Sequence, residues 1–558
     1  MRTHDWRWVA SQKTQATSAK IRPEWLLSLE VKKEAASRLD ITGSFIRGLM
    51  SGRERLITEA STVDLAHSLQ QGEYTATEVC LAYCKRAAFA HQLNNCLHEI
   101  FFDDAIELAR VYDDYYMTNG KTIGPLHGLP VSLKDQFHVR HAETTMGYVG
   151  WVGTFEGKKG TGREFHDESQ IVEELRSLGA IFYCKTSCPQ TLLLGETVNN
   201  LIGSTMNPVH QMLSCGGSSG GEAALMALGG SSVGLGTDIG GSVRIPAAFC
   251  GVYAIKPSFG RFSYRTVANT TPGQTLVPSA IGFLSTTLPA LELIMKSVLS
   301  TQPWLRDPDV VEIPWRDGLS PCRPKLCFAV LRNDGMVTPH PPIARGIDIV
   351  VEAVKKAGHE VVEWNPPSHA DGTYLHVSHQ FMAADGGQHI WKQLNILREP
   401  LIDGMTGDYG GGPFEPMPLL EYQDKGLRVK AYRAQYDQYW NSTAATTSTN
   451  TPVDAVIMPV APHAAVLPDK YFHYGYTTIV DLLNYSAVSF PVTKAEEAID
   501  QPDPDFKPMN DDDLENWEAY DAKKYDGAPV GVQIMGRRFD EERLLGIARH
   551  VDGLLASR

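Results

Sequence analysis

Two serine-centred glycine clusters decide how this chain folds: SCGGSSGGE at residues 214–222 and GLGTDIGGSVRIP at residues 234–246. Glycine permits positive φ angles and close approach of the backbone. A helical pattern, EAALMAL, follows the first cluster, and a shorter one, VRIPAAF, follows the second. Pro246 falls near the start of that second helix, where a missing N–H costs least. Because backbone N–H groups at a helix start are unpaired, the second cluster predicts an anion site.

The serine that closes the second cluster could attack a carbonyl group. If Ser242 is the nucleophile, the oxyanion would lie against backbone N–H groups of its own loop. Those groups belong to Ile239, Gly240, Gly241 and Ser242. A serine hydroxyl needs a base, and neither cluster contains His, the usual one. Lys134 ends the apolar run GLPVSLK and could serve if burial keeps it neutral. A lysine at the surface end of a strand would give the same local sequence.

Three motifs taken together favour a buried base at Lys134 over a surface lysine. GLPVSLKD (128–135), CGGSSGGEAAL (215–225) and GTDIGGSVRIPAAFCG (236–251) resemble the amidase-signature family, in the family's order. The two serines of interest, Ser218 and Ser242, are 24 residues apart, which matches the family's spacing. The chain is similar to the fungal acetamidase and general-amidase branch over about residues 55–555. The similarity is weakest in 400–450 and 494–526.

The resemblance implies an amidase that cleaves a carboxylic amide of a small molecule through a Ser-Ser-Lys triad. Lys134 would be the buried base, and Ser218 the bridging serine, preceded by a cis peptide bond. Ser242 would form the acyl-enzyme. The resemblance implies no metal and no organic cofactor. The implied fold is α/β, a single large domain with a mixed twisted central sheet surrounded by helices.

Other residues near the motifs are expected to support the site. Asp238 and Arg244 flank the loop and would hold it through hydrogen bonds or an ion pair. Ser219 could hydrogen-bond within the site or cap the following helix. Leu192 aligns with a pocket position of the family, although core packing would explain it equally well. The segment TTMGY could also border the acyl pocket, through Thr145, Met146 and Gly147.

The chain has no convincing linker, so one large domain is expected despite 558 residues. Residues 1–60 predict a helical lead-in, and residues 61–558 the catalytic domain, with its signature core at about 124–262. From about residue 123, short apolar runs alternate with glycine turns and helices, which is typical of an α/β sheet enzyme. The last segment, APVGVQIMGRRFDEERLLGIARHVDGLL (528–555), predicts a strand, a turn and a helix.

Helix-start signals are clear in the first hundred residues. Ser61 is expected to cap a helix that runs through Leu69. Thr75 and Glu78 have the spacing of a capping box, in which each side chain binds the other residue's backbone N–H.

Composition narrows the class of protein further. A net charge of −14 without a run of Lys or Arg argues against a nucleic-acid partner. Nine Cys without a C-x-x-C pair indicate free thiols in a reducing compartment rather than a zinc site. No secretory signal and no long apolar stretch occur, so we expect a cytoplasmic protein without a membrane span. A homodimer is left open.

Two rival interpretations use the same residues. GGSSG also satisfies G-x-S-x-G, the nucleophile elbow of α/β-hydrolases, in which Ser218 would be the nucleophile of an esterase. Asp454 and either His463 or His473 would complete that triad. The elbow needs a strand directly before it, and NPVHQMLSC is a poor strand. The other interpretation is a non-catalytic protein, or an amidotransferase-like subunit that needs partner chains.

Overall fold

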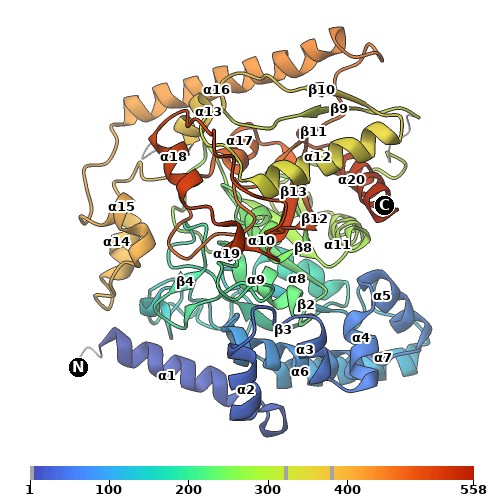
Figure 1. Cartoon of the computed structure of the whole chain (residues 1–558). Coiled ribbons are helices and arrows are strands. Elements are labelled where there is room, and N and C mark those ends of the chain that lie inside the picture. The colour runs from blue at the N-terminus through green and yellow to red at the C-terminus, as the bar shows by residue number, and fades with distance from the viewer. Residues whose placement is uncertain (1–4, 320–323, 377–381, 558) are drawn as a thin grey trace.

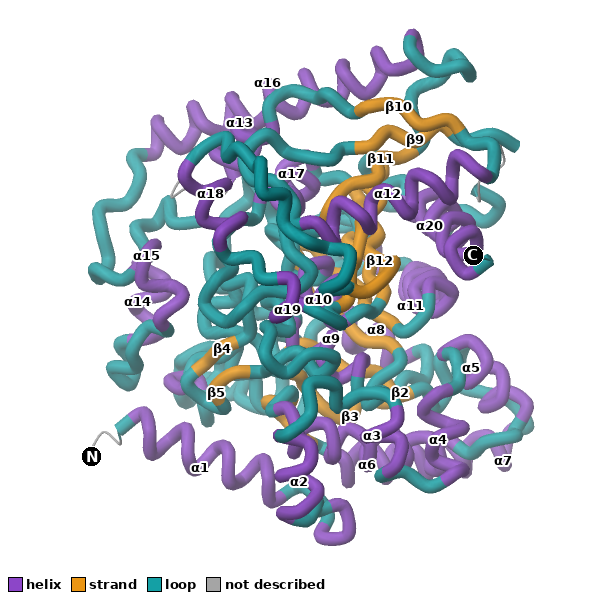
Figure 2. The backbone as a smooth tube through the Cα atoms, viewed as in Figure 1, coloured by secondary structure: helices purple, strands orange, loops and turns teal. Residues whose placement is uncertain are grey.

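Eleven strands of the described chain form one mixed β-sheet through its middle (Figure 2). The structure, a computed structural model, describes residues 5–319, 324–376 and 382–557. The strands of this sheet are β1 (Leu97–Ile100), β2 (Pro130–Lys134), β3 (Ile181–Thr186), β6 (Val233–Asp238), β7 (Tyr253–Lys256), β8 (Ala280–Ser285), β9 (Cys327–Val330), β10 (Glu360–Glu363), β11 (Ala455–Pro459), β12 (Ser486–Lys494) and β13 (Pro529–Gly536). Their order is β1-β3-β2-β6-β8-β7-β12-β13-β11-β9-β10. A separate small pair consists of β4 (Val198–Asn199) and β5 (Gly203–Ser204).

Helices surround this sheet (Figure 1). The first half of the chain contributes α1 (Trp6–Ala19), α2 (Leu29–Ala36), α3 (Ser44–Gly48), α4 (Gly52–Glu59), α5 (Thr62–Gln71), α6 (Ala76–Asn94), α7 (Phe102–Asn119), α8 (Gln170–Ser177), α9 (Gly220–Ala227) and α10 (Arg244–Cys250). The second half contributes α11 (Leu288–Ser300), α12 (Pro341–Lys356), α13 (His369–His376), α14 (Gln388–Leu394), α15 (Thr406–Tyr409), α16 (Leu419–Ser442), α17 (Gly475–Leu483), α18 (Asp511–Glu518), α19 (Ala522–Tyr525) and α20 (Glu541–Ala556). Short 3-10 helices lie at Pro23–Trp25, Val149–Trp151, Pro303–Leu305, Asp403–Met405 and Thr443–Ala445.

The helices divide according to the strands that they cover. In Figure 1 the early helices, from α1 to α7, lie beside the β2–β3 end of the sheet, and the long α16 runs along the β9–β10 end. Helix α20 packs on both α11 and α12; α11 covers β7 and β8, α20 covers β12 and β13, and α12 covers β10 to β13. One apolar core extends from Ile21 to Val551 and joins the N-terminal helices to the sheet. The expected fold class, one α/β domain with a mixed sheet inside helices, is confirmed.

Most local signals are found in the structure. Ser61 caps α5 by accepting from the N–H of Asp64, and Thr75 caps α6 by accepting from that of Glu78. The second bond of the predicted capping box, from the Thr75 N–H to Glu78, is wrong, because the Glu78 carboxylate binds Arg53 Nε at 2.6 Å instead. The predicted strand and helix at the end of the chain are β13 and α20.

The cysteines of the described chain are all buried and free, as the sequence predicts; Cys322 lies outside the described residues. Among the helices described, none has both the length and the apolar character that a membrane crossing requires.

Candidate active site

Two neighbouring parallel strands bring the candidate side chains together. Lys134 is the last residue of β2, and Asp238 is the last residue of β6. Because β2 and β6 are paired in parallel, their carboxyl ends meet at the same edge of the sheet. The loop at 239–243 then leads into α10, while Ser218 and Ser219 stand directly before α9. The two glycine clusters therefore meet beside the end of β2.

Lys134 has no exposed surface, since its side chain is 0% accessible. Its Nζ lies 2.7 Å from Ser218 Oγ and 3.1 Å from Thr237 Oγ1. The Thr237 hydroxyl donates its own proton to Gln136 Oε1 at 2.6 Å, so its oxygen accepts from Lys134. Burial lowers the pKa of Lys134 to about 8. An amine that donates to Thr237 keeps a lone pair for Ser218, whereas an ammonium would need a third acceptor.

Glu222, in the first turn of α9, is a carboxyl group near Lys134 that could have kept the lysine charged. Both of its oxygens are hydrogen-bonded to hydroxyls, Ser132 Oγ at 2.6 Å and Thr186 Oγ1 at 2.9 Å. Burial raises the pKa of Glu222 to about 8. At neutral pH this carboxyl is mostly protonated, and because the pKa of Lys134 is also about 8, the two groups change charge over the same pH range.

The peptide bond between Gly217 and Ser218 is cis, as the family resemblance implies. Ser219 follows it and was expected either to bond within the site or to cap the next helix. Its hydroxyl makes no capping bond to α9 and has no partner among the described residues. Its backbone N–H, however, donates to Ser242 O at 2.9 Å. Ser219 thus joins the two serine segments through the main chain, and the capping interpretation is wrong.

Asp238 and Arg244 hold the loop between β6 and α10. The Asp238 carboxylate accepts from the N–H groups of Gly241 at 2.7 Å and Val243 at 3.0 Å. Arg244 binds both oxygens of that carboxylate, through Nε at 3.1 Å and Nη2 at 2.9 Å. Burial alone would raise the pKa of Asp238, but the Arg244 guanidinium holds it well below its usual range. The loop is therefore bound to a buried ion pair, as the sequence predicts.

This arrangement revises the set of oxyanion donors. The Gly241 N–H is already bonded to Asp238, so it is not available to a substrate oxygen. Within the described chain, the N–H groups of Ile239, Gly240 and Ser242 have no acceptor. The four expected donors are thus reduced to three, because the loop uses one of them to maintain its own shape.

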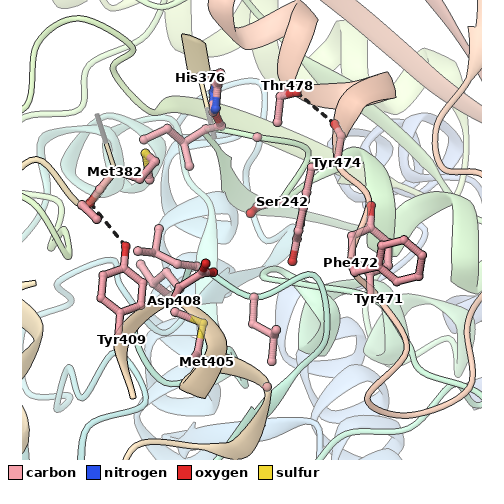
Figure 3. A pocket seen from close by; sticks show the side chains of 17 residues that line it. Ser242, His376, Met382, Met405, Asp408, Tyr409, Tyr471, Phe472, Tyr474 and Thr478 are labelled. Carbon is pink, nitrogen blue, oxygen red and sulfur yellow. Dashed lines mark hydrogen bonds between the residues drawn. The ribbon is translucent and has the colours of Figure 1, made fainter. Parts of the chain in front are cut away.

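A cavity of about 290 Å³ opens beside this loop. Ile239, Gly240 and Ser242 lie in its wall, and Figure 3 shows Ser242 facing the space between Tyr474 and the residues opposite. Most of the other lining side chains are apolar or aromatic. They include Leu192, Leu194, Met382, Met405, Tyr409, Tyr471, Phe472 and Tyr474.

The structure separates the two pocket candidates of the sequence. Leu192 lines the cavity. Thr145, Met146 and Gly147 do not, so the expectation that they border the acyl pocket is wrong. The N–H groups of Thr145 and Met146 instead bind the carboxylate of Asp135, at 3.0 and 2.9 Å.

The nucleophile-elbow interpretation is wrong in this fold. Residues 207–213 form turns rather than the strand that an elbow needs. Its proposed partners are occupied elsewhere: His473 binds Asp334 at 2.6 Å, and Asp454 forms an ion pair with Arg543. His463 packs edge-on against Phe249. The side chain that hydrogen-bonds Ser218 is Lys134.

Four residues of the site were not identified from the sequence. Thr237 lies inside the third quoted motif and Gln136 directly follows the first, so their positions next to Asp238 and Asp135 could have identified them. His376 and Thr477 lie far from every motif. His376 Nε2 is 2.7 Å from Ile239 O, and Thr477 Oγ1 donates to Gly240 O at 2.6 Å. Only the tertiary structure brings these two to the loop.

An α/β sheet that places a buried lysine beside Ser218, with Ser242 in the wall of a cavity, is the arrangement expected of serine-type amide hydrolases. Comparison with known proteins agrees. The family model described as Amidase matches residues 78–545. The chain therefore belongs to the amidase family and is a hydrolase acting on amide bonds.

Individual relatives extend over the whole chain. An acetamidase of Emericella nidulans is 40% identical, over 99% of this chain and 98% of its own length. Amidase 1 of Gibberella moniliformis is 39% identical, over 90% and 94% of the two chains. A solved fatty acid amide hydrolase structure superimposes with a TM-score of 0.91 at 30% identity, covering 99% of this chain and 95% of that one.

Two adjacent glycines of the loop should respond differently to a methyl group. Gly241 has φ +121°, and a Cβ there would lie 2.4 Å from Thr477 Oγ1. At Gly240 the nearest atom would be 3.5 Å away, an ordinary contact. We expect Gly241→Ala to lower kcat at least about 100-fold, because the displaced loop carries the oxyanion donors.

The matched variant Gly240→Ala should keep kcat within about tenfold of the wild type. Both are measured on purified protein whose circular dichroism and melting temperature are compared with the wild type. Equal losses in the two variants would contradict the placement of this loop.

Proposed function

We propose that Lys134, Ser218 and Ser242 hydrolyse a carboxylic amide through an acyl-enzyme on Ser242. One observation carries this proposal: a fully buried lysine nitrogen lies 2.7 Å from Ser218 Oγ, with no ionised carboxylate bound to it. A neutral amine in that position is a base, which a serine hydroxyl needs in order to attack.

The reaction begins with two proton transfers. Ser218 gives its proton to the neutral amine of Lys134 and takes the proton of Ser242. The Ser242 oxygen then forms a bond to the amide carbon, and the carbonyl π electrons move onto its oxygen. That negative charge is stabilised by the free N–H groups of Ile239, Gly240 and Ser242.

The relay then runs in reverse to release the amine. Ser218 donates a proton to the amide nitrogen and recovers one from Lys134, because an amide anion is too basic to leave. The carbon–nitrogen bond breaks, and ammonia or an amine departs from the acyl-enzyme. Water next gives a proton to the same relay and attacks the ester, which frees the carboxylate and restores Ser242. These steps use side chains and water alone.

We also propose that one chain suffices for this activity. Residues 61–558 would be the catalytic domain, with the signature core at about 124–262, and the helices before residue 60 a lead-in packed on it. Relatives named acetamidase and amidase match almost full length, which favours a hydrolase over an amidotransferase subunit. Release of ammonia from simple amides by the purified chain would separate the two. A cytoplasmic location and a homodimer remain proposals.

The nucleophile can be identified directly with a fluorophosphonate probe followed by peptide mapping. We expect the adduct on Ser242, and none in Ser242→Ala. Lys134→Met should react at least about 100-fold more slowly, because Ser242 then lacks its base. Labelling of Ser218 in the wild-type chain would refute the assigned roles.

The rate should depend on pH through the protonation of Lys134. The reaction needs the neutral amine, whose pKa burial lowers to about 8. We therefore expect kcat/KM to rise about tenfold per pH unit below pH 8 and to level off above it.

The titration of Glu222 must be distinguished from that of Lys134, because the pKa of Glu222 is also about 8. The control is Glu222→Gln, which keeps a neutral polar group between the two hydroxyls. If Lys134 determines the profile, the inflection persists in this variant; if it disappears, Glu222 is the titrating group.

The cavity also suggests the size of the acyl group. At about 290 Å³ the cavity is near the lower end of the range for small-molecule pockets, roughly 300–1,000 Å³. An acetyl group would fill only part of this space, whose wall combines apolar and aromatic side chains with polar ones such as Asp408. Although relatives are named acetamidases, we propose that this chain prefers amides of a larger apolar or aromatic acid.

A series of primary amides tests this preference. We expect kcat/KM for hexanamide and phenylacetamide to exceed that for acetamide by at least about tenfold, because each buried methylene contributes to binding. Ala383→Phe, which fills part of the cavity wall, should reduce that advantage. A wild-type preference for acetamide would contradict the proposal.

A further inference from the structure

The peptide bond between Ile239 and Gly240 lies beside the nucleophile, since both residues line the same cavity as Ser242. Its carbonyl oxygen is 2.7 Å from Nε2 of His376. A carbonyl oxygen can only accept, so Nε2 carries the proton and donates it. The C=O and N–H of a planar trans peptide point in opposite directions. This bond therefore directs the Gly240 N–H away from His376, and that N–H has no acceptor in the described chain.

His376 is suited to act as a permanent donor. It is the last residue of α13, and its ring is buried in the wall of the cavity (Figure 3). Burial lowers the pKa of His376 to about 4, so the ring is neutral at neutral pH. With the proton on Nε2, Nδ1 is bare, and it has no hydrogen-bond partner among the residues described. In the described chain the imidazole thus makes one hydrogen bond, from Nε2 to the Ile239 carbonyl.

The next peptide of the loop, between Gly240 and Gly241, is held from the neighbouring helix α17. Thr477 Oγ1, on α17, donates to the Gly240 carbonyl at 2.6 Å. Helices α13 and α17 pack against each other. At its other end this second peptide is fixed by the bond from Gly241 N–H to Asp238 at 2.7 Å. The second peptide is thus bound at both ends, whereas the first is bound only through His376.

A peptide held at one end can rotate when that bond is lost. Gly240 has no side chain, and an added Cβ would meet only ordinary contacts at 3.5 and 3.6 Å. Rotation would turn the Ile239 carbonyl oxygen, instead of the Gly240 N–H, toward the negative charge of the tetrahedral intermediate. That exchange would replace a stabilising dipole by a repulsive one.

We propose that His376 is a positioning residue, which keeps the Gly240 N–H in the oxyanion hole by binding the Ile239 carbonyl. The proposal rests on the proposed function of Ser242. His376 exchanges no proton with the substrate. It acts on the transition state through the peptide, so its loss should lower kcat and leave ground-state binding largely intact.

The test is a matched pair of variants. His376→Phe keeps a ring but removes the donor, and His376→Gln can present an N–H at the place of Nε2. We expect His376→Phe to lower kcat about 10–100-fold with KM changed less than about threefold, and His376→Gln to recover most of the rate. His376→Met is a second donor-free variant should the Phe variant not fold.

A transition-state mimic gives a readout that a merely structural role would not move. Phenylethylboronic acid forms a tetrahedral adduct with an active serine, with an oxygen in the oxyanion position. Its Ki should rise in His376→Phe by the same factor as kcat/KM falls, while the Ki of the product carboxylate stays the same.

The outcomes distinguish this inference from the proposed function. If the wild-type Ser242 takes no fluorophosphonate label, the proposed function itself fails. If Ser242 is labelled but His376→Phe keeps its kcat, or His376→Gln performs no better than Phe, only the role of His376 is overturned. Unchanged affinity for the boronic acid would overturn it as well.

Discussion

The contact between Lys134 Nζ and Ser218 Oγ, 2.7 Å long in a fully buried position, is the constraint that the rest of the site serves. It is useful only while the amine is uncharged, so every acidic group nearby has to be neutral or satisfied by another cation. Glu222 meets the first condition below about pH 8, the value to which burial raises its pKa. Asp135 and Asp238 meet the second.

Each of those two aspartates has its own cation. Asp135 follows Lys134 in sequence, yet its carboxylate pairs with Lys185 at 3.0 Å and binds His98 at 3.1 Å. Asp238 pairs with Arg244, which also reaches Asp481 at 2.7 Å. Burying such pairs costs desolvation energy and is a weak source of stability. Their value here is geometric: Asp238 fixes the backbone on both sides of Ser242, and Asp135 that of Thr145 and Met146, while Lys134 has no ion-pair partner in the described part of the chain.

The sequence shows the three motifs of this centre, but the family resemblance is what implies how they assemble, because a surface lysine at a strand end would give the same local sequence as Lys134. Lys134 ends a buried apolar strand, and the glycine clusters place Ser218 and Ser242 at two turns, each just before a helix. Asp238 and Arg244 are six residues apart, so their pairing across one loop is also a short-range feature. The predictions that failed concern groups for which two hydrogen-bond partners compete. The Glu78 carboxylate could accept from the Thr75 N–H or from Arg53, and it binds Arg53. The Gly241 N–H donates to Asp238 and so does not serve the oxyanion position.

The distant half of the site could not be predicted from the sequence, because its residues have no pattern of their own. His376 and Thr477 stand on two helices that meet only after the sheet has formed, and each binds a main-chain oxygen, which any sequence offers. The same helix α13 ends beside the acyl cavity, whose wall continues through Met382 and Ala383. His376 therefore lines this cavity and also binds the Ile239 carbonyl of the loop that carries Ser242.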